Sequence, residues 1–408
     1  MNTDFVAKTP APAQIRGPVV LFMSLAAALG TSTIYPLQPA VADVAHSLGS
    51  SVAAVGVALA CGSVGYLLGL CLLVPLVDRF AANRVLAAQF TALAAALAVS
   101  AAAGSAAVLG VVVGVVGACS AVGAGLSSVA GRWAPPRRRA TTLGVVTAGI
   151  SAGILAGRIV GGWLSDRIGW RPMVLVFAGA GALIAVACWV VIPSARGTVE
   201  RGYLSTLRSL PGLIIRNATL RMAALRGALW FFAFCAIWAG LAVALSGPPF
   251  SYSAEQIGLY SLAGLSGILV TPLAGSLTDR IGARWVIVAG LVTAGLVAAV
   301  IGSTLDNTPM TLVCLAIFDA GLFAAQVANQ STVLTIDPAS PARYNSAYMV
   351  VYFVGGGLGT AFGPVATEGF GWTATAITAA VAIGLACTLA LVPARPAATR
   401  ATDDAATA

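Results

Sequence analysis

The acidic residue with the clearest chemical potential is Asp319, which lies in a long apolar stretch at residues 309–334. About ten residues of that stretch precede it, or about 15 Å of helix, which places the carboxylate near the middle of a bilayer. A carboxylate is costly to bury at that depth, so such residues usually line a cavity or a proton pathway. We expect Asp319 to exchange protons or to contact a cationic substrate. The alternative is a hydrogen bond or an ion pair inside the protein, with Arg158 as the candidate cation.

Three amides follow Asp319 on the same apolar stretch. Gln326 and Gln330 lie seven and eleven positions after it, which helical geometry places on one stripe, and Asn329 flanks them. This stripe predicts a polar cavity wall. The alternative is that the amides hold neighbouring helices together through hydrogen bonds.

Aromatic side chains recur at every fourth position on two further apolar stretches. They are Trp230, Phe234 and Trp238 on the first stretch, and Tyr344, Tyr348 and Tyr352, with Asn345, on the second. An aromatic wall would suit a flat or apolar substrate and could stack on a cation. The alternative for both stretches is ordinary packing against protein or lipid.

The composition decides which elements position these residues. Of the 408 residues, 59% are hydrophobic and 9% are charged, and the mean hydropathy is +0.95. A soluble domain is about 25% charged. A membrane protein with several spans is the class that fits.

Twelve apolar runs, bounded by polar residues, glycine or proline, are long enough to cross a bilayer. Runs of this length without alternation favour helices over barrel strands. We therefore expect an all-α membrane protein with twelve transmembrane helices. The expected spans are residues 18–41, 52–76, 84–104, 106–130, 141–163, 172–192, 223–246, 255–277, 284–304, 309–334, 344–366 and 371–393.

The basic residues predict the orientation. If the amino terminus is cytoplasmic, all 22 Lys and Arg residues except Arg158, Arg167 and Arg171 fall in cytoplasmic segments or at their edges. This is the positive-inside rule, which predicts both termini in the cytoplasm of a cell (inner or plasma) membrane. Because the net charge of +9 is distributed in this way, it does not indicate nucleic acid as a partner.

The first half of the chain repeats in the second at an offset of 202 residues. Asp166 corresponds to Glu368, and five further residues are identical between the halves: Gly153, Gly157, Gly161, Gly169 and Trp170 match Gly355, Gly359, Gly363, Gly371 and Trp372. We expect two pseudo-symmetric six-helix bundles, at residues 1–193 and, with a short cytoplasmic tail, at 223–408. A basic cytoplasmic linker at 194–222 would form a short interfacial helix or remain a solvated connection.

Each half carries a ladder of glycines spaced four residues apart. The ladders are Gly153, Gly157 and Gly161, followed by Gly162, and Gly355, Gly359 and Gly363. Small residues allow helix backbones to approach closely. We expect these ladders to form a tight interface between the two halves.

The cysteines and the histidine give no sign of a metal site. All seven cysteines fall inside apolar runs without a C-x-x-C pair, so they act as small apolar residues, and His46 lies in a loop. The sequence also has no G-x4-G-K-[ST] loop that would bind a nucleotide. We expect no metal, no cofactor and no enzymatic activity.

Two Asp-Arg strings, after the second and the eighth predicted spans, carry a family resemblance. The string GSLTDRIGAR at Gly275–Arg284 resembles the loop signature G-x-x-x-D-R-x-G-x-R of the major facilitator superfamily. The first-half copy, after the second span, has Val74 and Ala81 at the two glycine positions. The resemblance implies the major facilitator fold, with a cavity lined by the first, fourth, seventh and tenth helices. It also implies loops that latch the inner gate, through Asp78, Arg79, Arg84, Gly275, Asp279, Arg280, Gly282 and Arg284.

Two strings narrow the resemblance to twelve-span drug/proton antiporters. They are LGTSTIYPLQP at Leu29–Pro39 and GILAGRIVGG at Gly153–Gly162, in which Arg158 replaces a proline of the family pattern. We expect the Arg158 side chain either to snorkel towards the outer surface or to pair with an acid.

The resemblance implies a secondary transporter, driven by the proton gradient, that exports a small, partly hydrophobic organic compound. We expect a monomer whose partners are the substrate, protons and the lipid bilayer. The alternatives are import or facilitated diffusion of a polar metabolite, and a non-transport membrane sensor. An integral-membrane enzyme would need clustered His, Asp, Glu or Cys at a membrane face, which the sequence lacks.

Overall fold

Apolar helices account for nearly all of the regular structure in the computed structural model, which describes residues 17–135, 138–194, 203–337 and 341–392. In these residues there is no β-strand. Eleven helical segments are long and apolar enough to cross a membrane, and α1, Gly17–Ser32, is a shorter apolar helix. Together they correspond to the twelve predicted spans, so the all-α, twelve-helix fold is confirmed.

Six of the spans form the first half. After α1 come α2 (Val41–Ser47), α3 (Val52–Leu72), the 3₁₀ turn η1 (Val74–Asp78), α4 (Ala82–Ala101), α5 (Ala106–Ser120), α6 (Val122–Trp133), α7 (Arg139–Ile168) and α8 (Trp170–Val191). The fourth span is thus interrupted at Ala121, between α5 and α6.

The second half begins after α9 (Tyr203–Arg216). It contains α10 (Ala218–Ser246), α11 (Ala254–Leu259), η3 (Tyr260–Gly264), α12 (Leu265–Ile281), α13 (Ala283–Ile301), α14 (Thr308–Leu334), α15 (Pro341–Phe370) and α16 (Trp372–Leu391). The eighth span is therefore built from three consecutive helical segments, α11, η3 and α12.

The first span is shorter than predicted. We expected a helix over 18–41, but α1 ends at Ser32 and the chain continues in turns to α2. Pro36 and Pro39 lie in these turns, and proline lacks the amide hydrogen that a helix interior needs. The turns carry Tyr35 and Gln38 into the centre of the molecule, where both line a cavity.

The expected linker contains helical structure. α9 occupies 203–216, and α10 begins at Ala218, where the Asn217 side chain accepts a hydrogen bond from the Leu220 amide at 2.9 Å. Asparagine at this position satisfies an amide that has no partner within the helix, which explains the early start of α10. Association of α9 with a membrane surface remains a prediction.

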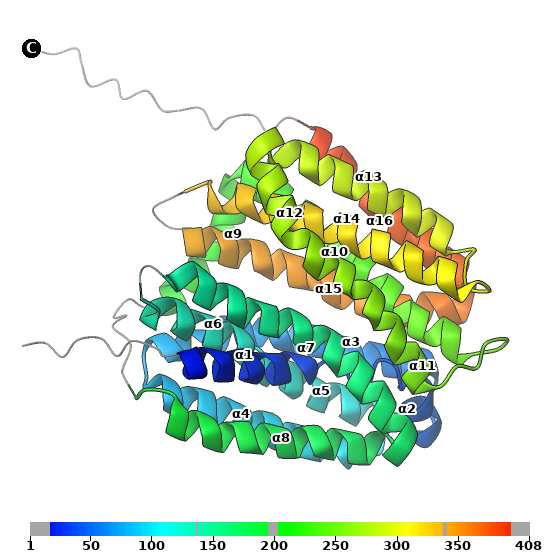
Figure 1. Ribbon diagram of the computed structural model, residues 1–408. Coiled ribbons are helices and arrows are strands. Elements are labelled where there is room, and N and C mark those ends of the chain that lie inside the picture. The colour runs from blue at the N-terminus through cyan, green and yellow to red at the C-terminus, as the bar shows by residue number, and fades with distance from the viewer. Residues whose placement is uncertain (1–16, 136–137, 195–202, 338–340, 393–408) are drawn as a thin grey trace, which may run out of the picture.

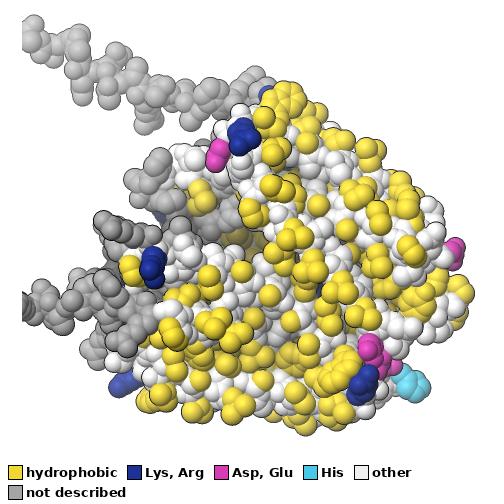
Figure 2. Space-filling view, viewed as in Figure 1, with side chains coloured by type: hydrophobic (Ala, Val, Ile, Leu, Met, Phe, Trp, Pro, Cys, Tyr) yellow, Lys and Arg dark blue, Asp and Glu magenta, His cyan; other side chains and the backbone are white. Residues whose placement is uncertain are grey.

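The two halves lie side by side, the first in blue to green and the second in light green to red (Figure 1). α1 begins and α16 ends at the same end of the bundle, where α9 also lies; we call this the α9 end. The opposite end, which carries α2 and α11, is the α2 end. On the face in Figure 2, hydrophobic side chains cover the middle, and charged side chains lie towards the two ends. This is the pattern of a surface that contacts lipid.

The glycine ladders pack helices within each half. A Cβ atom at Gly153 would lie 2.3 Å from the Ala28 carbonyl oxygen of α1, and one at Gly359 would lie 2.1 Å from the Phe232 carbonyl oxygen of α10. The ladders thus join α7 to α1 and α15 to α10. Our expectation of an interface between the halves was wrong, because the ladder faces point towards the helices of their own bundle. Gly162, just beyond the first ladder, is the exception, since it meets Ala254 of the second half.

A candidate substrate cavity between the two halves

A cavity of about 180 Å³ lies between the halves near the middle of the bundle. The first half contributes α1, the turns after it, α3 and α7, and the second half contributes α10, α14 and α15. The lining residues are Thr31, Ile34, Tyr35, Gln38, Leu59, Ser63, Tyr66, Ile150, Ile154, Arg158, Trp230, Phe231, Phe234, Cys235, Phe323, Tyr352, Phe353 and Thr360.

The lining helices differ from those that the resemblance implied. None of the described lining residues belongs to α5 or α6, which together form the fourth span. Glycines at Gly65 and Gly117 bring α3 and α5 into backbone contact, so α5 packs against α3 and not against the cavity. α3 of the first half, which the sequence did not single out as a lining helix, contributes instead. α15 of the second half also contributes, as the aromatic spacing that includes Tyr352 predicted.

Aromatic rings form much of the cavity wall. Phe231 and Tyr352 stack with ring centroids 4.0 Å apart, and Trp230 meets Tyr352 edge-on at 5.2 Å. From the first half, Tyr66 contacts Phe353 at 4.9 Å. Trp230, Phe234 and Tyr352 had been predicted from their spacing. Phe231, Tyr66 and Phe353 had not been predicted, because none of the three belongs to a repeating aromatic stripe in the sequence.

Among the described residues that line the cavity, Arg158 is the one that carries a charge. It is only 6% exposed, and its Nε donates a hydrogen bond to Gln38 Oε1 at 3.0 Å. The guanidinium lies over the rings of Tyr35 and Trp238, at 5.1 and 4.6 Å from their centroids. It therefore does not snorkel to the surface, and no ion pair to it occurs within the described residues.

Asp319 lies immediately behind this wall and does not line the cavity. It is 1% exposed, and its Oδ1 accepts a hydrogen bond from Trp238 Nε1 at 3.2 Å. Its Oδ2 faces Gly264, where a Cβ atom would come within 3.2 Å of it. Trp238 thus contacts both charged groups, with its ring face towards Arg158 and its N–H towards Asp319.

The amides after Asp319 bind other helices. The Tyr348 hydroxyl donates to Gln326 Oε1 at 2.7 Å, and Gln330 Nε2 donates to Asn345 Oδ1 at 3.0 Å. Tyr348 is fully buried, and none of these four side chains lines the cavity. Of the two alternatives for the stripe, this structure thus favours contacts between α14 and α15.

Asn329 completes this network through an arginine that the sequence reading did not single out. Arg226 of α10 donates to Asn329 Oδ1 from Nε at 3.1 Å and from Nη2 at 2.9 Å. Arg226 lies only a few residues beyond the basic linker, so in the sequence it resembled the other basic residues at the edges of cytoplasmic segments. Its position inside α10 could have marked it, because an arginine within a span is rare.

The first Asp-Arg loop is bound within its own half. Asp78 pairs with Arg132 at 3.1 Å and accepts a hydrogen bond from Ser128 at 3.2 Å. Arg132 also donates to the Val77 carbonyl at 2.9 Å, and the Arg84 guanidinium lies 6.0 Å from the Trp189 ring centre. Here the loop is held to α6, and the latch role of Asp78, Arg79 and Arg84 remains a prediction.

The second loop shows why its glycine matters. Gly282 has φ +88° at the junction of α12 and α13, a conformation that favours glycine. Ala81, at the equivalent place in the first half, has φ −62°, so the two loops differ in backbone path. Arg284 donates to the Leu391 carbonyl at 2.7 Å. Gly275 has open space beside it, and Asp279 and Arg280 are exposed.

Two carboxylates join the halves at the α2 end. Asp166, at the end of α7, accepts hydrogen bonds from the amides of Ala254 at 3.0 Å and Glu255 at 2.8 Å, which begin α11. Glu368, near the end of α15, accepts from the Ala53 amide at the start of α3. The repeat had matched Asp166 to Glu368, and the structure gives them equivalent roles. We call this pair of contacts the carboxylate latch.

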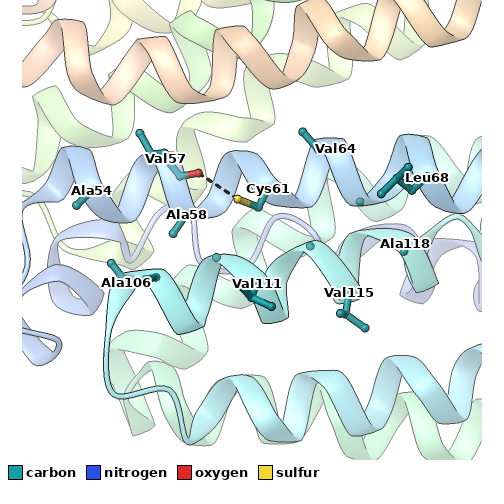
Figure 3. A pocket seen from close by; sticks show the side chains of 14 residues that line it. Ala54, Val57, Ala58, Cys61, Val64, Leu68, Ala106, Val111, Val115 and Ala118 are labelled. Atoms are coloured by element: carbon teal, nitrogen blue, oxygen red, sulfur yellow. Dashed lines mark hydrogen bonds between the residues drawn. The ribbon is translucent and has the colours of Figure 1, made fainter.

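A second hollow, of about 780 Å³, lies between α3 and α5 (Figure 3). Its lining is almost entirely small or aliphatic, as Ala58, Val64 and Val111 illustrate, and none of the described residues that line it is charged. Val64 is 54% exposed and Val111 is 72% exposed. An apolar seam of this kind on a membrane-spanning surface suits lipid chains, so the central cavity is the candidate substrate site.

Comparisons with known proteins agree with this architecture. The family model described as Major Facilitator Superfamily matches residues 20–333 and 228–407. A transporter of Streptomyces coelicolor is 36% identical over 356 residues, covering 86% of this chain and 81% of that protein. The transporter YgaY of Escherichia coli O157:H7 is 29% identical over 362 residues, covering 89% and 92%.

Among solved structures, a bacterial homologue of the human lysosomal transporter Spinster has a TM-score of 0.76 at 16% identity, covering 91% of this chain and 95% of that one. This likeness concerns the fold. The family model and the Streptomyces relative each cover most of the sequence, and the twelve helices agree with them. The chain belongs to the Major Facilitator Superfamily of membrane transporters.

Proposed function

We propose that this protein is a proton-coupled secondary transporter that exports a small, partly hydrophobic organic compound across the cell membrane by alternating access. The observation that carries the proposal is Asp319, a carboxylate buried at mid-span and hydrogen-bonded to Trp238 behind the central cavity. An acid in this position can gain and lose a proton within reach of the substrate site. The resemblance of the first and fifth spans to antiporter motifs supports export as the direction.

The contacts of Trp238 supply a route for coupling. A change of charge on Asp319 alters the hydrogen bond from Trp238 Nε1, and the same indole ring carries the Arg158 guanidinium. Arg158 lines the cavity, so Trp238 and Arg158 connect the proton site at Asp319 with the substrate site. Two sites that share contacts in this way are energetically linked, and the linkage is reciprocal.

Alternating access requires that the halves separate at one end while they close at the other. Here the carboxylate latch holds the halves together at the α2 end. The distribution of the basic residues supports a cytoplasmic position for the α9 end. We propose that this conformation is closed towards the outside, and that release of the latch opens the route by which the substrate leaves.

The test is a screen of small organic compounds on proteoliposomes that contain a pH-sensitive dye. Wild-type protein should give compound-dependent proton movement, since each substrate molecule exchanges for protons. Asp319→Asn should abolish the signal because asparagine does not titrate. Asp306→Asn, which changes an exposed carboxylate in the loop before α14, is the matched control and should keep it.

Two results would refute the proposal. One is proton movement by a stable Asp319→Asn protein that equals the wild-type signal. The other is transport of a compound by wild-type protein with no accompanying proton movement at any pH tested.

A further inference from the structure

The described lining of the central cavity carries one positive charge and no negative charge. Arg158 is the charged residue in its lining, and the guanidinium is buried. In the described residues its assigned hydrogen bond is the one from Nε to Gln38. A guanidinium has five N–H donors, so the group retains donors for a further acceptor. The interior of a membrane protein makes an unpaired cation costly, which favours a counter-charge close by.

Asp319 does not serve as that counter-charge through direct contact. Within the described residues there is no ion pair between it and Arg158. Its Oδ1 is bound by Trp238 Nε1, and its Oδ2 faces Gly264. The Trp238 ring is in contact with both groups, so an acceptor for the guanidinium has to approach from elsewhere. The cavity provides that approach, because Arg158 lines it and Asp319 does not.

The other polar features of the lining are neutral. Thr31 is 4% exposed, and its hydroxyl has no hydrogen-bond partner in the described structure. It lines the same cavity, so it can donate a hydrogen bond to an acceptor there. Gln38, on the same wall, is held by Arg158. A buried polar atom without a partner carries a cost that a ligand can remove.

The aromatic rings next to Arg158 disfavour a cationic ligand. Tyr35 and Trp238 are already covered by the guanidinium. A second cation at these faces would meet a like charge in a medium of low dielectric constant. The remaining rings, which include the stacked Phe231 and Tyr352, provide flat apolar surface on the side of the second half. The lining thus combines an anion-binding group with an aromatic wall.

We infer that this cavity binds an organic anion with a flat apolar body, of the aromatic carboxylate class, and that Arg158 is the residue that binds its carboxylate. The inference rests on the proposed function, because it identifies the ligand with the transported compound. It narrows the proposed substrate from a partly hydrophobic compound in general to an organic anion with a flat apolar body.

The test is equilibrium binding to the full-length protein in nanodiscs of zwitterionic lipid, measured by calorimetry against empty nanodiscs. The probes are 2-naphthoate, its neutral amide 2-naphthamide, and the cation 2-naphthylmethylammonium. Benzoate shows whether a smaller aromatic anion binds as tightly as the bicyclic 2-naphthoate, and decanoate shows whether a fatty acid of the membrane does. A charge-assisted hydrogen bond predicts that 2-naphthoate binds at least about tenfold more tightly than the amide.

The variants locate the charge that gives this preference. Arg158→Gln should bring the acid and the amide to similar affinity, and Arg158→Lys should restore part of the preference. Arg226→Gln is the matched control, because Arg226 is a second arginine inside a span that lies outside the cavity lining. It should leave the preference unchanged. Elution from size-exclusion chromatography and the unfolding temperature show which variants are folded.

Three results would overturn the inference. The first is that none of the three carboxylates binds more tightly than the neutral 2-naphthamide. The second is that the cation 2-naphthylmethylammonium binds more tightly than 2-naphthoate. The third is that folded Arg158→Gln protein prefers 2-naphthoate over its amide as strongly as the wild-type protein does. Binding is measured without a pH gradient, so it can be detected whether or not the protein couples transport to protons. A retained anion preference with no compound-driven proton movement would contradict the proposed function alone.

Discussion

At the scale of single residues, Trp238 is the side chain that connects the two buried charges. Its ring face contacts the Arg158 guanidinium, and its N–H donates to Asp319 Oδ1. The aromatic spacing predicted Trp238 as part of the cavity wall. The structure instead places it behind that wall, since it is absent from the lining.

Replacement of Trp238 by phenylalanine should separate these two contacts. Trp238→Phe keeps an aromatic face for Arg158 but removes the hydrogen bond to Asp319. A buried hydrogen bond to a charged group contributes roughly 1.5–3 kcal/mol, so we expect a measurable loss of unfolding free energy. Chemical denaturation in detergent measures it. Trp285→Phe, at a residue that is 62% exposed, is the control, and equal losses in both variants would contradict the assigned contact.

The sequence predicted the charged residues of this region better than its uncharged ones. Asp319 and Arg158 stand out because a charge inside an apolar run is rare. Their ion pair, one of the alternatives, is absent from the described contacts, because spacing along the chain does not determine which side chains face each other. Tyr35 and Tyr66 were missed for the same reason: each is a single tyrosine, and only tertiary packing brings both to the cavity.

At the scale of helices, close backbone packing explains the glycine ladders. A Cβ at Gly359 would come within 2.1 Å of the Phe232 carbonyl oxygen, and backbone does not move aside as a flexible side chain would. The sequence showed that close packing was required at these positions. It did not show the partner, because a ladder is compatible with any neighbouring helix.

Alanine at a ladder position should disrupt the contact between α10 and α15. Gly359→Ala inserts a methyl group into a packed interface, and overpacking of this kind typically costs about 1–3 kcal/mol. Gly384→Ala on α16 is the matched control, since no atom lies within 4 Å of its Cβ position. Thermal unfolding should show a lower midpoint for Gly359→Ala only. A midpoint equal to that of the control would refute the packing role.

The carboxylate latch joins helix ends from opposite halves. α3 and α11 begin with the equivalent serines Ser51 and Ser253, whose side chains cap their own helices. Asp166 and Glu368 then bind further amides at these helix starts. Negative charge at a helix N-terminus is favourable, so each contact stabilises the closed arrangement at the α2 end.

Removal of both latch charges should shift the protein towards an opening at the α2 end. The double variant Asp166→Asn, Glu368→Gln keeps the shape of each side chain and removes its charge; contacts of this kind contribute up to about 2 kcal/mol each. Spin labels at His46 and Asp306, exposed residues at that end of the two halves, report the separation. We expect a longer distance population to grow. An unchanged distribution, with normal folding, would contradict the latch.

At the scale of the whole molecule, the repeat and the count of apolar runs predicted the architecture. Each half has six spans, and the residues related by the 202-residue offset occupy equivalent places, as Asp166 and Glu368 show. What the sequence did not predict was the internal breaks of individual spans. α11, η3 and α12 form one span with changes of helical type, which depend on local packing that hydropathy does not report.

The orientation in the membrane is a separate prediction for the whole molecule. Arg138 and Ser209 should be cytoplasmic, and Asp306 should be external, because the basic residues gather on the side of the membrane that carries Arg138 and Ser209. A single cysteine at each position, tested with a membrane-impermeant thiol reagent on intact cells, gives the answer. Labelling at Ser209 from outside would overturn the assignment.

The central claim is that Asp319 couples transport to protons, and gradient-driven transport in proteoliposomes tests it most directly. For a compound that the wild-type protein moves, accumulation under an imposed pH gradient is compared with counterflow exchange in its absence. We predict that Asp319→Asn loses accumulation and keeps exchange, because the substrate can still cross while no proton is carried. Asp319→Glu should retain part of the accumulation. Uphill accumulation by a folded Asp319→Asn protein would contradict the account.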